Sequence, residues 1–481
     1  MIFSSITFLF FFLPALLLLY PFAGKWQNAL LLVASLFFYT WGEGVYLGIL
    51  LVSIAINYLA GRAIGNCRAR GQDGKSLAAQ ITLTLAIIAD FVLLGFYKYA
   101  DFLTDNLNWL LSHLALPSVS LTPAHPPLGI SFFTFQAVAY LVDIYRGQVT
   151  ASKRLTDFTL FISFFPRLAA GPIVRYLNMA AALKNRTVTA EGYAAGIERF
   201  VFGLAKKVLL ANPLGQTADQ IYALPLADLS SPLAWLAAVC YMLQIYFDFS
   251  GYTDMAIGLG RMFGFHLPEN FNYPYISRGI QEFWRRWHIT LSSWFRDYLY
   301  IPLGGNRHGS IRTYVNLLTV FILCGLWHGA NWTFVFWGLY HGFFIICEHL
   351  AKPLTNRHPV PPWLAYPATV FIIMIGWVFF RCDTLPQAIS HIAAMFGQTE
   401  ASGGIVPFIN RKFVCELAVA TALSMPLWPW LRQRWVSYVG DSTPKALFAA
   451  SCRVLGLAAL LYAVITNLAA GSYNPFIYFR F

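Results

Sequence analysis

Long apolar stretches separated by short polar segments run along almost the whole chain. The first occupies residues 4–24, and further stretches lie at about residues 28–41, 45–61, 78–97, 128–145, 193–211, 232–247, 313–333, 334–350, 363–380, 412–430 and 446–470. Several are shorter than the ~20 residues that a helix needs to cross a bilayer at right angles. The pattern predicts an all-α polytopic membrane protein with about 11 spans, in which short helices tilt, re-enter or surround a thin centre.

The first stretch is predicted to be a membrane span and not a cleaved signal peptide. No positive charge precedes it, and no small-x-small cleavage site followed by polar sequence is visible. No repeat, low-complexity tail or soluble linker interrupts the rest of the chain. We therefore expect a single membrane domain over residues 1–481.

Composition supports a membrane environment. The 481-residue chain is 58% hydrophobic and only 11% charged, whereas soluble globular chains carry roughly 25% charged residues. The net charge of +12 fits basic cytoplasmic loops in such a protein, so no nucleic-acid partner is expected. The seven cysteines include no CxxC pair, and several lie in apolar runs. Neither a disulfide scaffold nor a metal site is expected.

The distribution of Lys and Arg predicts the orientation of the chain in the membrane. The loop at residues 62–75 is basic, as is the segment after Arg146, whereas no Lys or Arg lies between Lys98 and Arg146. Counting spans places residues 62–75 and 146–156 in the cytoplasm. It places residues 99–127 and the N-terminus outside, which is the periplasm in a Gram-negative bacterium.

The segment NYPYISRGIQEFWRRWHITLSSWFRDYLYIPLGGNRHG, residues 272–309, is both aromatic and basic. Large apolar residues recur three and four positions apart, which predicts an amphipathic helix near the cytoplasmic interface. The predicted apolar face carries Trp284, Trp287, Leu291 and Trp294 or Phe295, and the predicted polar face carries Arg285, His288, Ser292 and Arg296. Two interpretations remain open: an interfacial anchor, which composition favours, and a cationic mouth for an anionic ligand. The glycine turn IPLGGNRHG weakly indicates a phosphate contact through its backbone donors.

One titratable residue, His328, lies in the apolar run FILCGLWHGANWTF at residues 321–334. Ionisable residues are rare within membrane spans and usually face a cavity or pathway. Burial favours the neutral imidazole, which is the form that a general base needs. Gly325 and Gly329 let a helix or ligand approach closely, and Cys324, His328 and Asn331 are predicted to share a face. The residues alone leave catalysis and interhelical hydrogen bonding equally open.

Two further polar sets lie in apolar runs. Asp248 and Asp254 occur within QIYFDFSGYTDMAIGLG, where a carboxylate needs a cation or water. We expect them to be structural partners of an Arg in the region 278–296. The segment SFFPRLAAGPIVR contains Pro166 and a second proline, which predicts a bent or re-entrant segment. Its Arg167 is either a cavity charge or an interfacial anchor.

Six motifs together resemble a known family. They are PLGISFFTFQ, FFPRLAAGPIVR, YFDFSGYTDMAIGLG, NYPYISRGIQEFWRRWHITLSSWFRDYLYIPLGGNR, LWHGANWTFVFWGLYHG and the terminal NPFIYFRF. With them, the chain resembles the membrane-bound O-acyltransferase (MBOAT) family. Within that family it is similar to the bacterial branch that O-acetylates alginate, with relatives acting on cellulose, peptidoglycan and teichoic acid. The resemblance covers nearly the whole chain, and residues 270–345 carry its most specific part.

The resemblance implies a ring of membrane helices around a thin centre that a tunnel pierces. It implies that His328 is the catalytic base, which takes a proton from a hydroxyl as that hydroxyl attacks a thioester. It also implies that His288 is the second catalytic residue, which orients the thioester or supports the oxyanion. We expect donor contacts from Arg285, Arg286, Arg296, Arg307, Asn306 and Trp327, since arginine pairs bidentately with phosphate and glycine-rich turns present backbone amides.

The implied donor is cytoplasmic acetyl-CoA, with no metal. The acetyl group is expected to cross the inner membrane through the tunnel and to reach periplasmic SGNH-like acetyltransferases and other polysaccharide-modification proteins. Alginate is the first expectation for the polymer, and cellulose, peptidoglycan or another cell-surface polymer is the alternative. Two other function classes remain open: an acyl transporter without chemistry of its own, and a scaffold of a polymer-export complex. A transporter is expected to show paired charges in related halves, and no internal repeat is visible.

Overall fold

The computed structural model describes residues 2–69, 76–121, 125–399, 401, 403–439, 443–471 and 473–477. Over these residues the chain is helical and forms no β-strand. Its contacts divide it into two compact units: unit 1 is Met1–Gly196 with Leu259–Pro268, and unit 2 is Ile197–Gly258 with Glu269–Phe481. The all-α prediction is confirmed, and the single membrane domain stays a prediction.

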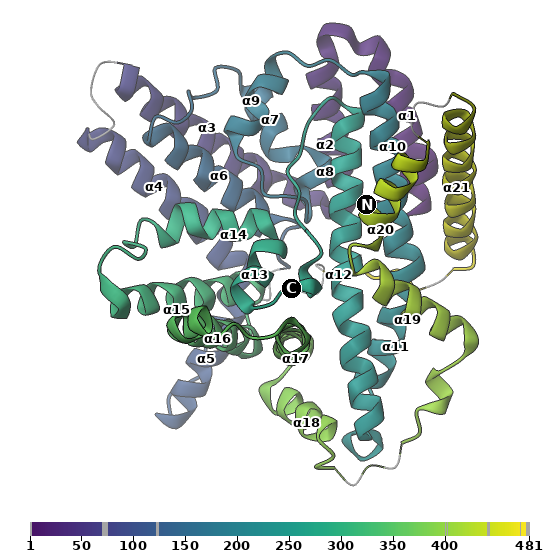
Figure 1. Ribbon diagram of the computed structural model, residues 1–481. Coiled ribbons are helices and arrows are strands. Elements are labelled where there is room, and N and C mark those ends of the chain that lie inside the picture. Colours follow the sequence, from purple (N-terminus) through teal and green to yellow (C-terminus); the bar gives the residue numbers. More distant parts are fainter. Residues whose placement is uncertain are drawn as a thin grey trace. The chain divides into compact units, whose positions relative to one another are not determined.

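Unit 1 contains the helices from α1 to α9 (Figure 1). They are α1 (Leu13–Leu19), α2 (Gln27–Glu43), α3 (Leu47–Ala69), α4 (Leu77–Leu94), α5 (Ala100–His113), α6 (Ile130–Tyr145), α7 (Leu155–Ser163), α8 (Phe165–Leu168) and α9 (Tyr176–Lys184), with the short π or 3-10 segments η1 (Phe8–Phe12), η2 (Tyr20–Trp26), η3 (Gly44–Tyr46) and η4 (Gly95–Tyr99). Two glycines divide the helical run Phe8–Ala69 into separate helices. Gly24 has φ 47° and Gly44 has φ 51°. Residues with a Cβ rarely adopt this backbone conformation, so glycine allows the chain to turn there.

The predicted bend in SFFPRLAAGPIVR is confirmed. α7 ends at Ser163 and α8 begins at Phe165, whose backbone N–H donates to Ser35 Oγ of α2 at 3.1 Å. Arg167 is 0% exposed, and its guanidinium lies 4.4 Å from the centre of the Phe161 ring. An interfacial anchor needs an exposed head group, so that interpretation of Arg167 is wrong.

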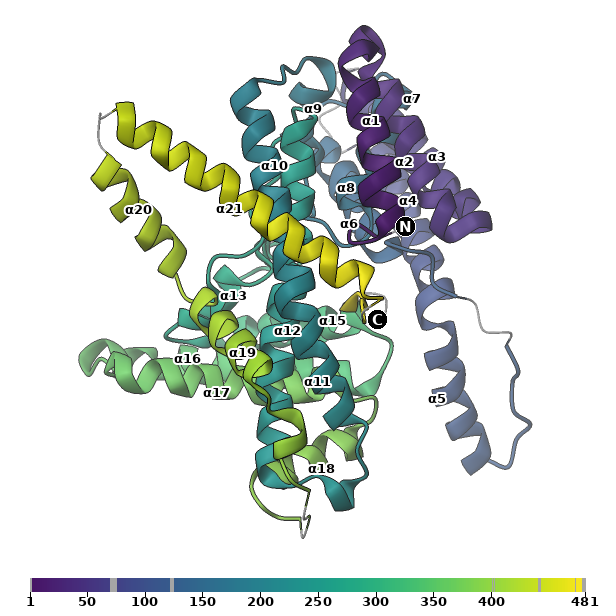
Figure 2. The same cartoon turned by 90° about the vertical axis from the view of Figure 1, so that its right-hand side faces the viewer.

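Unit 2 contains the helices from α11 to α21 except the end of α12, which belongs to unit 1 from Leu259 onward, and α10 (Ala190–Ala205) runs across the boundary between the units. The others are α11 (Asn212–Tyr222), α12 (Ser231–Met262), α13 (Ile280–Arg286), α14 (Ile289–Phe295), α15 (Gly309–His328), α16 (Trp332–Arg357), α17 (Pro362–Arg381), α18 (Leu385–Met395), α19 (Arg411–Leu423), α20 (Leu427–Val439) and α21 (Thr443–Ala469), with η5 (Lys206–Ala211), η6 (Leu226–Asp228), η7 (Pro274–Ile276), η8 (Arg296–Tyr300) and η9 (Val406–Phe408). Figure 2 shows α11 alongside the long helix α12. The contact is close because a Cβ on Gly215 would lie 2.4 Å from the amide of Gln244.

The helix α12 continues well beyond the apolar stretch that predicted it. Its second half carries Asp248 and Asp254, and both carboxylates are paired with cations. Asp248 lies 2.7 Å from Lys207 Nζ, and Asp254 lies 2.6 Å from both Arg199 and Lys206. The expected structural role is confirmed, but the expectation of a partner in the region 278–296 is wrong. Pairing lets the carboxylates remain in a buried helix, since an unpaired charge there is costly.

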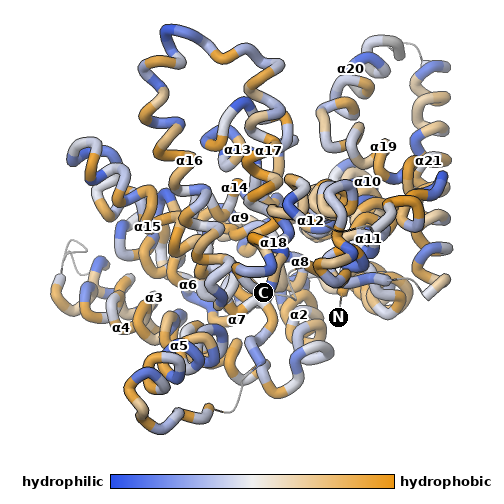
Figure 3. The backbone as a smooth tube through the Cα atoms, turned by 90° about the horizontal axis from the view of Figure 1, so that it is seen from below, coloured by the Kyte–Doolittle hydropathy of each residue, from blue (hydrophilic) through white to orange (hydrophobic). Residues whose placement is uncertain are grey.

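The described chain has seven helical runs long and apolar enough to cross a membrane, or eight if the bent pair α19 and α20 forms one span. Figure 3 shows apolar residues along α3, α4 and α16. The run Phe8–Ala69 alone contains α1, α2 and α3. The chain is therefore a multi-pass membrane protein, and the count of about 11 spans stays a prediction.

Candidate active site

The run that carries His328 is two helices and not one. α15 ends at His328, and the backbone is extended at Gly329, with φ −161°. α16 begins at Trp332 after Asn331, whose side chain accepts a hydrogen bond from the N–H of Thr333 at 3.0 Å. Residues 329–331 therefore form a break in which His328 is the last residue of its helix.

The break overturns one prediction about Asn331. Its side-chain amide donates to the carbonyl of Asp383 at 2.8 Å, while Cys324 and His328 lie one turn apart on α15. The three residues therefore do not share a helix face. The amide joins the break to the residues after α17.

The close approach predicted from the glycine spacing is confirmed. A Cβ on Gly325 would lie 2.2 Å from the carbonyl oxygen of Phe334, and one on Gly338 would lie 2.3 Å from that of Phe321. Figure 1 shows α15 and α16 side by side. The space beside these glycines is thus filled by the neighbouring helix and not by a ligand, and the tight packing fixes where α15 ends.

The imidazole of His328 is surrounded by aromatic rings. The side chain belongs to a residue that is 5% exposed, and its ring is T-shaped to Trp337 at 5.2 Å, to Phe380 at 5.1 Å and to Trp327 at 4.9 Å between ring centres. These rings come from α16, α17 and α15. Such a surrounding keeps bulk water from the imidazole.

His288 also lies at a break between helices. It separates α13 from α14 and has φ 44°, in the left-handed region. The predicted continuous amphipathic helix is therefore wrong, and so is the assignment of His288 to a polar face, because the residue is 0% exposed. The predicted apolar set is buried as expected: Trp284, Trp287, Leu291, Trp294 and Phe295.

Asn270 fixes the orientation and the tautomer of His288. Its Oδ1 accepts from the backbone N–H of Thr290 at 3.1 Å and from the Thr290 hydroxyl at 2.9 Å, which identifies this atom as the oxygen. The same oxygen lies 3.2 Å from His288 Nδ1. A neutral imidazole facing an acceptor carries its hydrogen on that nitrogen. Nε2 then holds the lone pair.

Burial lowers the pKa of His288 from 6.5 to about 3. The charged imidazolium is poorly solvated in this position, so the neutral form prevails near neutral pH. Nε2 is buried and has no hydrogen-bond partner among the described residues. His288 thus presents a neutral ring whose second nitrogen is a hydrogen-bond acceptor or a proton acceptor.

Trp327 lies between the two histidines. Its ring centre is 4.9 Å from that of His328 and 6.0 Å from that of His288. The structure thus brings together His328, His288 and Trp327, which the sequence predicted as site residues. The indole makes T-shaped contacts with both imidazoles, so the two histidines share a neighbour.

The arginines predicted to bind the donor lie in the segment 285–307, and most of them already pair with a carboxylate or a carbonyl of the protein. Arg286 pairs with Glu282 at 2.9 Å, and Arg296 pairs with Asp297 at 2.7 Å. Arg285 is exposed and makes no ion pair with a described residue. Of these guanidinium groups, that of Arg285 is therefore the most readily available to an anion.

The glycine turn uses its polar groups internally. The N–H groups of Gly304 and Gly305 donate to the carbonyls of Ile301 and Tyr300. The Arg307 side chain donates to the carbonyls of Gly304 and Ile301 at 3.2 and 3.1 Å. Asn306 at the tip is exposed. The turn has a defined shape, but fewer free backbone donors than its sequence suggested.

Three residues of the site were missed by the sequence interpretation. Asn270 precedes the histidine that it orients by 18 positions, and no periodicity connects the two. Trp337 and Phe380 lie on other helices, and their types are common throughout the chain. His341 on α16 is 0% exposed and T-shaped to Trp337 at 5.0 Å, so it belongs to the same aromatic cluster.

The described residues include no group of three or more His, Cys, Asp or Glu side chains that could hold a metal ion. The chemical groups of the site are two imidazoles, indoles and guanidinium groups. They suit the binding of an acyl donor and proton transfer at a hydroxyl or a thioester.

These features define a class: an all-α, multi-pass membrane protein with two buried imidazoles held at helix breaks among aromatic rings. A sequence model of the MBOAT, membrane-bound O-acyltransferase family, matches residues 151–382. The chain belongs to this family and is an O-acyltransferase.

Several relatives extend the similarity beyond the matched region. A probable alginate O-acetylase AlgI of Pseudomonas putida is 41% identical, with an alignment that covers 100% of both chains. A probable alginate O-acetylase AlgI of Azotobacter vinelandii is 43% identical over 88% of this chain and 83% of its own. A peptidoglycan O-acetyltransferase of Helicobacter pylori is 38% identical over 82% of this chain and 80% of its own.

Proposed function

We propose that this chain is an inner-membrane O-acetyltransferase that takes acetyl from cytoplasmic acetyl-CoA and passes it across the membrane for O-acetylation of alginate. The observation that carries the proposal is the placement of two buried imidazoles around Trp327 in a chain of the MBOAT family. The names of several relatives support alginate as the polymer. The name of the Helicobacter pylori relative supports peptidoglycan as the second candidate.

In the proposed reaction, His328 takes the proton of a hydroxyl while the hydroxyl oxygen attacks the carbonyl carbon of the acetyl thioester. A carbon–oxygen bond forms and the carbon–sulfur bond breaks. The imidazolium returns the proton to the departing thiolate, so the products are an acetyl ester and a free thiol. General-base help of this kind contributes ~10²–10⁴ in rate. The aromatic edges around the ring limit competing hydrolysis.

The hydrogen-bond pattern of His288 favours one of its two expected roles. A ring that carries its hydrogen on Nδ1 accepts at Nε2, so it does not donate to an oxyanion in this tautomer. Orientation of the donor, through an N–H or O–H group that donates to Nε2, is therefore better supported than oxyanion stabilisation. The low pKa, about 3, keeps this acceptor available at physiological pH.

For donor binding, the exposed guanidinium of Arg285 is the first contact that we propose for a phosphate group. Asn306 and Trp327 are proposed to complete the contacts. Arg286 and Arg296 also belong to the proposed set, with their carboxylate partners orienting them. Arg307 is proposed to act mainly by holding the shape of the turn.

The proposed orientation in the membrane rests on the distribution of Lys and Arg along the chain. The N-terminus is proposed to lie in the periplasm, since the basic segments 62–75 and 146–156 then face the cytoplasm. The hydroxyl that receives the acetyl group is proposed to belong to a periplasmic SGNH-like acetyltransferase or another polysaccharide-modification protein. That partner then transfers the group to the polymer.

The proposal is tested with His328→Gln in an alginate-producing strain that lacks its own enzyme, with polymer acetate measured by NMR. We expect the variant to reach normal membrane levels and to lose acetylation by at least about 100-fold. His391→Gln is the matched control, because Nε2 of this buried histidine donates to the carbonyl of Ala234 at 3.2 Å, outside the proposed site. Unchanged acetylation with His328→Gln would reject the catalytic role. Release of free thiol from acetyl-CoA by the purified protein distinguishes an enzyme from a transporter or scaffold.

A further inference from the structure

Unit 1 contains a polar cluster that the proposed acetyl transfer does not use. Ser53 and Asn57 on α3 face Asp90 on α4, and all three residues are 1% exposed or less. Asn57 Nδ2 donates to Asp90 Oδ1 at 2.7 Å and to the Ser53 carbonyl at 2.9 Å. Ser53 Oγ lies 3.4 Å from the same Asp90 oxygen. One carboxyl oxygen is thus fully engaged.

Two oxygens of this cluster remain without a partner among the described residues. They are Asp90 Oδ2 and Asn57 Oδ1, and both are buried. An ionised carboxylate and an amide carbonyl are acceptors only, so neither oxygen is able to satisfy the other. Two buried acceptors without donors destabilise the folded chain. The two planar groups that carry them already share a hydrogen bond, and one hydrogen added to the carboxyl group would supply a donor.

We propose that Asp90 binds a proton and forms a cyclic pair with Asn57. In this pair, Asn57 Nδ2 donates to Asp90 Oδ1, as observed, and the protonated Asp90 Oδ2 donates to Asn57 Oδ1. The proton comes from solvent during insertion or folding. Both leftover oxygens are satisfied by one hydrogen, and the contact between α3 and α4 carries no charge.

The other buried acidic residues of the described chain form ion pairs. Asp143 pairs with Arg175 at 2.8 Å, Asp248 with Lys207 at 2.7 Å, and Asp254 with Arg199 at 2.6 Å. Each of them faces a cation. The groups that bond to Asp90 are an amide and a hydroxyl, which are neutral. A neutral acid is therefore the form of Asp90 that its contacts satisfy.

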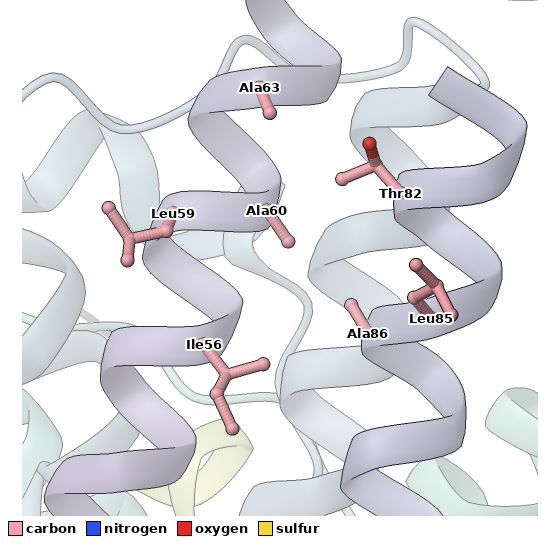
Figure 4. A pocket seen from close by; sticks show the side chains of 7 residues that line it. All are labelled: Ile56, Leu59, Ala60, Ala63, Thr82, Leu85 and Ala86. Atoms are coloured by element: carbon pink, nitrogen blue, oxygen red, sulfur yellow. The ribbon is translucent and has the colours of Figure 1, made fainter. Parts of the chain in front are cut away.

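An open apolar pocket of about 390 Å³ lies between the same two helices. Figure 4 shows its lining side chains: Ile56, Leu59, Ala60 and Ala63 on α3, and Thr82, Leu85 and Ala86 on α4. Ala86 is one turn before Asp90, and Ile56 is next to Asn57 in the sequence. A carboxylate beside such a hydrocarbon surface would lack solvation, and a charge within a membrane helix is destabilising. A cyclic neutral pair avoids this cost.

The test combines infrared spectroscopy with stability on the purified full chain. With carboxyl-labelled aspartate, we expect an isotope-shifted band of a protonated carboxylic acid in the wild type, and its loss in Asp90→Asn. An amide forms the same two-bond ring with Asn57, so Asp90→Asn should leave the melting temperature nearly unchanged. Asp90→Ala removes the partner of Asn57 on α4, leaves Asn57 Nδ2 only its bond to the Ser53 carbonyl, and should lower the melting temperature by several degrees.

The matched control is Asp143→Asn, at an equally buried carboxylate that is ion-paired. We expect this variant to lose carboxylate absorption, to keep the acid band and to lower the melting temperature, because Arg175 loses its partner. The proposal is overturned if Asp90→Asn removes carboxylate absorption and not the acid band, or if it destabilises the protein as much as Asp143→Asn does. Neither result depends on acetyl-transfer activity.

Discussion

Asn270→Asp is the substitution that most directly tests how His288 is held. The introduced carboxylate has the shape of the amide, so its oxygen can take the same position near Thr290 and His288 Nδ1. The change replaces a neutral acceptor by a charged one at about 3.2 Å from the imidazole. A negative charge at this distance favours the imidazolium, so the pKa of His288 rises.

The expected change in the pKa of His288 follows from the distance to the new charge and from the starting pKa. An opposite charge within hydrogen-bond reach moves a pKa by roughly 1–3, and the pKa of His288 begins at about 3 because of burial. We therefore expect a pKa between about 4 and 6 in the variant. At pH 5, a group with a pKa of about 6 is neutral in only about a tenth of molecules. Protonation turns Nε2 from an acceptor into a donor, so activity falls as the pH falls.

The assay is thiol release from acetyl-CoA by purified protein, measured across about pH 5 to 8. The ratio of variant to wild-type activity removes the titration of His328, which both proteins share. We expect that ratio to be near one at pH 8 and to fall as the pH falls, to about a half at pH 5 for a variant pKa of about 5 and to about a tenth for a pKa of about 6. In the wild type, His288 should contribute no pH dependence over this range, since its pKa is far lower.

The control variant Asn270→Ala removes the acceptor without adding charge. It removes the oxygen that His288 Nδ1 and the two Thr290 donors share, so we expect a loss that is the same at every pH. A flat ratio for Asn270→Asp, with a folded protein, would refute the argument that the oxygen of Asn270 sets the tautomer and the charge of His288.

Three further predictions follow from packing and burial. Gly325→Ala should destabilise the hairpin of α15 and α16 by about 1–3 kcal/mol or more, because the new Cβ would lie 2.2 Å from a carbonyl oxygen. Gly456→Ala, where nothing lies within 4 Å, should be neutral or stabilising in the same thermal-unfolding assay. Lys207→Met should cost about 3–5 kcal/mol by stranding Asp248, and adding Asp248→Leu should recover most of this loss. His288→Asn should flatten the pH dependence of stability, because the unfolded histidine binds its proton near pH 6.5 and the folded one only near pH 3. This penalty reaches about 2 kcal/mol at pH 5 in the wild type and vanishes above pH 7.

The sequence predicted the elements better than their ends. Each apolar stretch of the chain corresponds to one or two helices of the structure, because hydrophobicity over a long window is dominated by burial in lipid or protein. The stretch at 232–247 was too short by half, since α12 continues through Asp248 and Asp254 to Met262. A pattern of single residues does not reveal that distant cations neutralise those carboxylates.

The residues of the candidate site were also predicted only in part. The residue types and the family resemblance identified His328, His288 and Trp327, and the structure brings these three together. Helical periodicity failed for the segment 284–296, because the left-handed backbone of His288 breaks the helix. The orienting residue Asn270 was not predictable, since its contact depends on a tertiary fold and not on spacing.

Helical periodicity failed at two places, the segment 284–296 and the predicted shared face of Cys324, His328 and Asn331. Both failures have the same physical cause, which is a break in a helix next to a histidine. His328 is the last residue of α15, and His288 lies in the break between α13 and α14. A side chain inside a helix has its direction fixed by the helix axis, whereas a side chain at a break is directed by local caps and tertiary contacts. The left-handed conformation of a non-glycine residue costs of order 1–3 kcal/mol, and such strain clusters at functional sites. Two imidazoles from separate helices, each at a break, thus reach the same indole, and a helical backbone at His288 in place of the left-handed one would redirect that ring.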